Sequence, residues 1–139
     1  MRFQNGSRLQ KILSFAFANT AIDSFRASPD LKEIHSLAFY NCANLALVAL
    51  DENITYLGEL CFLNTALKNV YLPPVLDTSN EELGVGQHFD NVYVVPDGTS
   101  TITSGTVNNA NNVVVVPNSV TKLSENAFKG RANLKRIVF

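Results

Sequence analysis

Four residues of this 139-residue chain could take part in nucleophilic catalysis. Cys42 and Cys61 could act as nucleophiles, and His35 and His88 could act as bases. Catalysis of this kind needs a nucleophile, a base and an orienting group within hydrogen-bond reach of one another. Both cysteines instead fall at core positions of a repeating apolar pattern, where cysteine behaves as a small hydrophobic residue. We therefore expect no catalytic residue and no enzyme.

The sequence contains no motif whose residue spacing would indicate a metal or cofactor site. The chain lacks Cys-x-x-Cys, His-x-x-x-His and calcium-loop patterns, and its LGVGQ segment lacks the Lys and Ser of a phosphate-binding loop. We therefore expect no metal ion and no cofactor. A disulfide between Cys42 and Cys61 stays open at this point, because the two lie one coil apart but in different positions of the repeat. His35 is expected to face solvent.

Composition narrows the possible partners. The formal net charge is −1, and the Lys and Arg residues form no basic run, so we expect neither nucleic acid nor an anionic membrane as partner. No apolar run approaches the roughly 20 residues that a membrane-spanning helix requires, so no membrane insertion is expected. The opening stretch MRFQNGSRLQ has no apolar core or cleavage site, so we expect no signal peptide in this chain.

The elements that would position any functional residue come from an internal repeat. In its first half, an apolar residue is followed after three positions by another, then after four by a small residue that directly precedes Phe. Copies start at residues 9, 31, 54 and 120, with steps of 22, 23 and 66, so two worn copies are expected within 75–111. The four complete copies are Leu9/Ile12/Ala16/Phe17, Leu31/Ile34/Ala38/Phe39, Ile54/Leu57/Cys61/Phe62 and Val120/Leu123/Ala127/Phe128.

The second half of the repeat alternates as a strand does. NVYLPP at 69–74 is echoed by NVYVVP at 91–96 and NVVVVP at 112–117. We expect each coil to add one strand to a single parallel sheet, with a helical turn or short helix around Ala-Phe on the opposite wall. The segments within 75–111 that lack Ala-Phe are expected to form irregular loops. The residues predicted to point into the core are Phe25, Val48, Val70, Val92, Val114 and Ile137.

These motifs resemble the BspA-like (treponemal-type) leucine-rich repeat. The resemblance rests on the unit V-T-x-L-x-x-x-A-F-x-x-x-x-x-L-x-x-I and on linkers such as VVPNSVTKL at 115–123. It is specific in 31–72 and 113–139, moderate in 9–27 and weak in 75–111. The resemblance implies an α/β repeat: a right-handed leucine-rich-repeat solenoid of about six coils over residues 1–139. It also implies a non-catalytic adhesion or binding module of a cell-surface or secreted protein.

The outward side chains of neighbouring strands are the candidate binding residues. Strands in a sheet are about 4.8 Å apart, so Tyr71 and Tyr93 are predicted to lie side by side on the exposed face, with Asn69 and Asn91 next to them. Lys68 and Asp90 border this patch. We expect the face to recognise a protein or glycan partner. In the alternative, the pairs only stabilise the sheet, and the solenoid is a structural spacer with no ligand of its own.

The C-terminal residue, Phe139, falls within a predicted strand. A strand with unpaired backbone groups is a template for association. Two explanations stay open: the chain is a fragment of a longer repeat protein, which we favour, or its ends self-associate through the C-terminal strand.

Overall fold

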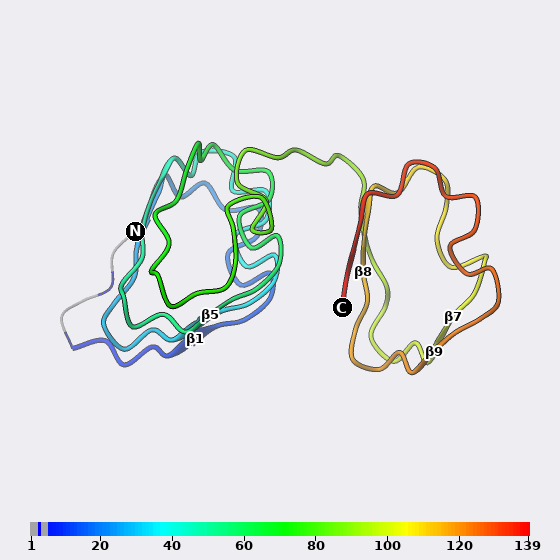
Figure 1. The fold of residues 1–139 in the computed structure, drawn as a ribbon, viewed down its shortest axis with the longest axis horizontal. Helices are drawn as coiled ribbons and strands as arrows, with labels where there is room; N and C mark the ends of the chain where they lie inside the picture. Colours follow the sequence, from blue (N-terminus) through cyan, green and yellow to red (C-terminus); the bar gives the residue numbers. More distant parts are fainter. Residues whose placement is uncertain (1–2, 4–5) are drawn as a thin grey trace. The chain divides into compact units, whose positions relative to one another are not determined.

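The computed structural model describes residue 3 and residues 6–139, which form short parallel strands joined by turns (Figure 1). Residues 1–2 and 4–5, part of the stretch searched for a signal peptide, lie outside the described residues. The chain divides into two compact units, Met1–His88 (unit 1) and Phe89–Phe139 (unit 2), which are described separately. A single domain over residues 1–139 stays a prediction.

Unit 1 builds two parallel sheets, where one sheet was predicted. The strands of the second half of the repeat pair as predicted, with Phe25 opposite Val48. The first half also forms strands, which align Ile12, Ile34 and Leu57 in one buried column. The first-half strands are β1 (Lys11–Ile12), β3 (Glu33–Ile34) and β5 (Tyr56–Leu57), and the second-half strands are β2 (Ser24–Arg26) and β4 (Leu47–Ala49).

Unit 2 repeats this plan with fewer coils. Its larger sheet has the strand order β10-β8-β6, and a two-stranded sheet pairs β7 with β9. All of these pairs are parallel. The bounds are β6 (Val92–Val94), β7 (Thr101–Ile102), β8 (Val113–Val115), β9 (Lys122–Leu123) and β10 (Arg136–Val138).

The register of β6 corrects the predicted inward column. Val92 pairs with Val113, and Tyr93 pairs with Val114, so Tyr93 takes the inward position that was assigned to Val92. Tyr93 accordingly packs against the core of unit 2. The prediction was wrong because it assumed a step of 22 residues between these coils, whereas the paired residues are 21 apart. A shift of one residue turns each side chain to the opposite face of a strand.

The predicted helical turns around Ala-Phe are also wrong, because no helix occurs among the described residues. Each complete copy bends through tight turns, as in the bonds from Ala16 N to Leu13 O (3.1 Å) and from Ala18 N to Phe15 O (3.0 Å). The residues two before and two after the Phe have positive φ, which interrupts a right-handed helix. These residues are Phe15 and Asn19, Leu37 and Asn41, Leu60 and Asn64, and Asn126 and Gly130.

The worn copies within 75–111 are more regular than predicted. Ile102 in β7 is fully buried, and the turn from Thr106 N to Thr103 O matches the turn from Ala127 N to Ser124 O in the next coil. Val107 therefore occupies the Phe position and is buried. The other worn copy stacks on its neighbour through Phe62 N and Leu83 O, 2.9 Å apart.

No membrane-spanning helix is present in the part of the chain that the structure describes.

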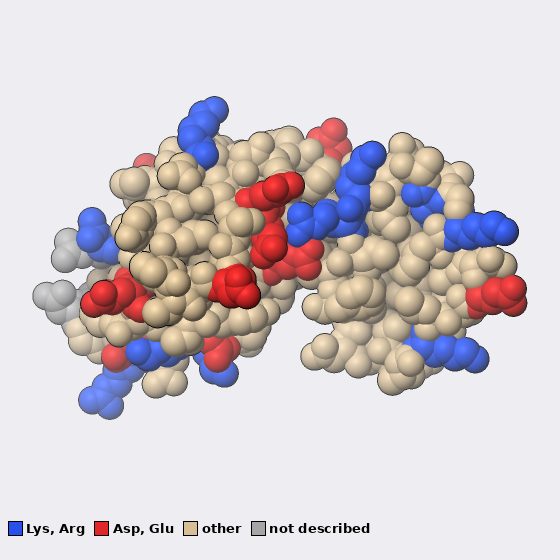
Figure 2. Space-filling view, viewed as in Figure 1, with Lys and Arg blue, Asp and Glu red and all other residues tan. Residues whose placement is uncertain are grey.

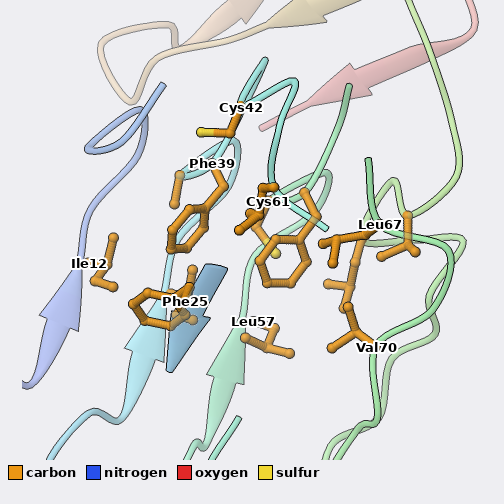
Figure 3. Packing of buried hydrophobic residues seen from close by; sticks show 14 of the residues in the cluster. Ile12, Phe25, Phe39, Cys42, Leu57, Cys61, Leu67 and Val70 are labelled. Atoms are coloured by element: carbon orange, nitrogen blue, oxygen red, sulfur yellow. The ribbon is translucent and has the colours of Figure 1, made fainter. Parts of the chain in front are cut away.

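The phenylalanines of the repeat form the centre of the unit 1 core (Figure 3). The rings of Phe17 and Phe39 stack with centroids 5.1 Å apart, and those of Phe39 and Phe62 lie 5.5 Å apart. Phe25 packs against this stack from β2, with its ring centroid 4.9 Å from that of Phe39. Successive coils thus bury one continuous apolar column, which holds the sheet faces in place.

Candidate functional site

The two cysteines are core residues. Cys42 and Cys61 are both buried and free, so no disulfide joins them. Cys61 occupies the small position before Phe62, and its burial raises the pKa of the thiol. Cys42 Sγ donates a hydrogen bond to Phe17 O at 3.0 Å. Because the nucleophile in cysteine chemistry is the thiolate, the pKa shift makes Cys61 a poor nucleophile.

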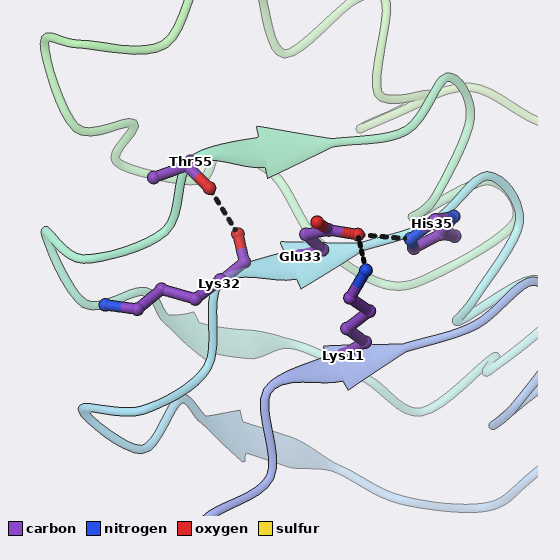
Figure 4. Close-up of polar contacts among 5 residues, drawn as sticks. All are labelled: Lys11, Lys32, Glu33, His35 and Thr55. Carbon is purple, nitrogen blue, oxygen red and sulfur yellow. Dashed lines mark hydrogen bonds and ion pairs between the residues drawn. The ribbon is translucent and has the colours of Figure 1, made fainter.

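His35 belongs to a small ionic cluster on the outer face of β1 and β3 (Figure 4). Its Nε2 lies 2.8 Å from Glu33 Oε2, and Lys11 Nζ lies 3.3 Å from the same oxygen. The His35 side chain is 33% exposed, in line with the prediction that it faces solvent. Glu33 and His35 are two residues apart along an extended segment, so their side chains point to the same side and can form a hydrogen bond.

The hydrogen bond from His35 is the main cause that lowers the pKa of Glu33, and Lys11 adds to the effect, while desolvation opposes it. A carboxyl whose pKa is lower in the folded state stabilises the fold above its unfolded pKa. That stabilisation is lost as the pH falls through the folded pKa. The cluster therefore acts as a structural ion-pair group that weakens in acid.

Among the described residues, no group of three or more His, Cys, Asp and Glu could hold a metal ion.

The predicted binding residues fall into two sets. Lys68, Asn69 and Tyr71 belong to unit 1, while Asp90, Asn91 and Tyr93 belong to unit 2. Each set lies within one unit. A contact between Tyr71 and Tyr93 stays a prediction. Their settings differ: the Tyr71 side chain is 78% exposed, whereas Tyr93 packs against a core cluster.

The two asparagines of the predicted patch are engaged in local hydrogen bonds. Asn69 Oδ1 accepts a bond of 3.0 Å from Asn80 Nδ2. Asn91 exchanges bonds with Asn112: Asn91 N donates to Asn112 Oδ1 at 3.3 Å, and Asn112 N donates to Asn91 O at 2.8 Å. Both side chains are exposed at the surface. The Asn69 side chain bonds to that of Asn80, whereas Asn91 bonds to Asn112 through its backbone.

The outward positions of unit 1 form a surface that we call the unit 1 face: Arg26, Leu47, Asn69 and Tyr71. Arg26 lies at the end of β2, and Leu47 begins β4, where it pairs with Ser24. Tyr71 follows Ala49 by one repeat of 22 residues. Leu47 is 64% exposed. Leu47 precedes Val48, which was predicted to point into the core, so strand alternation places Leu47 at an outward position. It was not selected as a binding residue, although a large apolar residue at an outward position is the signal that could have identified it.

Charge contributes little to this surface. Acidic and basic side chains are spread over both units in the view of Figure 2, with broad uncharged areas between them. The unit 1 face itself has one cation, Arg26, next to apolar and amide side chains. Such a face can offer apolar contact area, an aromatic ring and hydrogen-bonding groups, but it carries no strong electrostatic field.

Comparisons with known proteins agree with the repeat. The family model for the BspA type leucine rich repeat region matches residues 2–83 and 88–139 in six copies. Among curated proteins, no sequence matches this chain.

Two solved structures match this chain. A leucine rich cell surface protein from Faecalibacterium prausnitzii is 21% identical, with a TM-score of 0.42, and the match covers 93% of this chain and 42% of that one. The pneumococcal vaccine antigen PcpA is 18% identical, with a TM-score of 0.44, over 99% of this chain and 44% of that one. The chain thus spans less than half the length of either structure.

Because the family model matches nearly every residue of the repeat pattern, the chain belongs to the BspA type leucine-rich repeat family.

Proposed function

We propose that this chain is a non-catalytic binding module of a cell-surface or secreted protein, and that it contacts a protein or glycan partner through the unit 1 face. Membership of a leucine-rich repeat family supports a binding or scaffold role. Repeat solenoids typically bind through extended surfaces made of equivalent positions in successive coils. The unit 1 face is a surface of this kind, since its members come from three successive coils.

The observation that carries the proposal is the exposure of Leu47 and Tyr71. These side chains are 64% and 78% exposed, although each lies within one residue of a core position. Tyrosine and arginine are enriched in protein interfaces, and tyrosine also presents a flat apolar ring with a hydroxyl group, which suits contact with a sugar. Arg26 supplies a charged hydrogen-bond donor on the same face. Neither exposed side chain is required by the core.

A binding screen with matched variants tests the proposal. The chain is applied to a panel of purified extracellular-matrix proteins and to a glycan array. Any component bound by the unchanged chain is then tested with the double variant Leu47→Ser/Tyr71→Ala. We expect binding at least about tenfold weaker with an unchanged unfolding midpoint, since loss of apolar and aromatic contacts costs about 1.4 kcal/mol or more.

The control variant is Leu123→Ser, which removes a side chain that is 47% exposed in unit 2. It should bind as the unchanged chain does. Equal binding by the double variant would contradict the assignment of the unit 1 face. If neither the protein panel nor the array yields a bound component, the alternative role as a structural spacer is favoured.

A further inference from the structure

The backbone of Val70 is paired by a side chain instead of by a strand. Val70 N donates to Asn80 Oδ1 at 2.9 Å, and Asn80 Nδ2 donates to Val70 O at 3.0 Å. Val70 is buried at the inward position that follows Phe25 and Val48 in the repeat. Its N–H and C=O are therefore the groups that would be offered to one further strand.

The carboxamide of Asn80 is chemically suited to this place. Its acceptor and donor lie next to each other, as in a peptide group, so one side chain satisfies both backbone groups of Val70. The same Nδ2 also donates to Asn69 Oδ1 at 3.0 Å, which fixes the orientation of the amide. Asn80 thus supplies the hydrogen bonds of a neighbouring strand without continuing the sheet.

The loop that carries Asn80 is anchored on the core of unit 1. Asn80 O accepts a bond of 3.0 Å from Val85 N, and Val85 and Leu83, two residues before it, are buried. Leu83 O in turn accepts from Phe62 N at 2.9 Å. Because this stack holds its backbone, the Asn80 side chain is presented to Val70 by an anchored loop.

We propose that the Asn80 side chain blocks the sheet edge at Val70, so that a second copy of this chain cannot add a strand there. An open edge offers unpaired N–H and C=O groups and is a template for pairing. A second copy is the suitable partner because two identical edges can pair antiparallel about Val70, so that each supplies the groups the other lacks. The exposed Tyr71 beside the edge would add apolar contact to such a pair. This inference does not depend on the proposed binding function.

Replacement of Asn80 tests the proposal. In Asn80→Ala, the amide hydrogen of Val70 should exchange at least about tenfold faster than in the unchanged chain at low protein concentration, because its acceptor is gone. As the concentration rises, the mass from light scattering should increase towards that of a dimer, and protection of Val70 should return. The unchanged chain should show a smaller rise in mass over the same range.

The matched control is Asn53→Ala. Asn53 is also a loop asparagine of unit 1, but its side chain bonds to Asp51 and to no strand backbone. It should leave both readouts unchanged. Should Asn80→Ala fail to fold, Asn80→Ser, which keeps a polar side chain too short to satisfy both groups, provides the same two measurements. A mass equal to that of the unchanged chain at every concentration, or an unchanged exchange rate at Val70, would overturn the proposal.

Discussion

The two units join their coils by different means on the wall that carries the Phe of each repeat. In unit 1, the backbone itself bonds from one turn to the next, from Phe17 N to Ala38 O at 2.8 Å and from Phe39 N to Cys61 O at 2.9 Å. In unit 2, side chains make the connection. Arg131 donates to Asn109 Oδ1 at 2.9 Å and to the carbonyl of Ser104. Asn133 Nδ2 donates to Asn109 O at 2.7 Å.

The difference follows from how similar the stacked turns are. Neighbouring turns of equal length and shape favour a backbone ladder, and three coils of unit 1 keep identical spacing and the same Phe. In unit 1 the ladder also continues to a worn copy, from Phe62 N to Leu83 O. In unit 2, the turn around Phe128 lies beside one with Val107 at the Phe position. Where the turns differ, long side chains bridge the gap between their backbones.

Backbone strain shows the same contrast. The residue two before Phe has positive φ in both units, but it is Phe15, Leu37 or Leu60 in unit 1 and Asn126 in unit 2. Bulky side chains are disfavoured in this conformation, at a cost of about 1 kcal/mol or more each, whereas Asn tolerates it. Leu37 and Leu60 are fully buried, so their burial offsets that cost. A large core can support strain that a small one avoids.

The largest effect is expected from Gly58→Ala in unit 1. A Cβ at Gly58 would lie 2.2 Å from Ser36 N and 2.6 Å from His35 C, which are backbone atoms of the neighbouring coil. Because the ladder holds these coils together, we expect a loss of more than about 3 kcal/mol of unfolding free energy, measured by urea unfolding. Gly105→Ala in unit 2 is the control, since its Cβ meets only Thr103 Oγ1 at 3.9 Å. Equal stability of the two variants would show that the unit 1 coils are not locked together.

A smaller effect is expected from truncation of the equivalent phenylalanines. Phe39→Ala removes a fully buried ring from the middle of a stack, and we expect a loss of about 3 kcal/mol. Phe128→Ala removes a half-buried ring from a smaller cluster and should cost about 1.5 kcal/mol. Residue-resolved hydrogen exchange would report each unit separately. If both variants lose the same stability, the contrast between the two cores is wrong.

The smallest of these effects is expected from Arg131→Met. The variant keeps an apolar stem but removes both bonds to the neighbouring coil, which should cost about 1–2 kcal/mol and speed amide exchange in residues 104–109. Lys129→Met is the matched control, because Lys129 is an exposed residue of the same turn. A similar result for both variants would mean that the bridge contributes nothing to unit 2.

Much of this architecture could be predicted because the regular spacing of apolar residues indicates which side chains are buried. The columns that contain Ile12, Ile34 and Leu57 follow directly from the repeat. The register at Tyr93 could not be predicted from apolar type alone, since Val92, Tyr93 and Val94 all suit a strand. The positive φ values were missed because Leu37 and Leu60 are typical helix-forming residues, and only stacking against neighbours holds them in this conformation.

The polar features were harder to foresee. Asn80 contacts Val70 across ten residues of a degenerate segment, and no periodicity marks this pair. The exposure of Leu47 and Tyr71 could be predicted from strand alternation, whereas the partial burial of Tyr93 depended on the register. Side chains that bond to backbone in irregular segments depend on the local path of the chain, which composition does not specify.

The tight turns around each Phe have a consequence for how such proteins change length. Their bends are closed by bonds within one coil, as between Tyr40 N and Leu37 O at 3.1 Å and between Cys42 N and Phe39 O at 3.2 Å. The turns of a coil are therefore closed within that coil, and an equivalent neighbour supplies the packing contacts and the ladder bonds. Gene duplication of a 22- or 23-residue segment would insert a complete coil without redesign of either flank, so copy number can drift more freely than coil size.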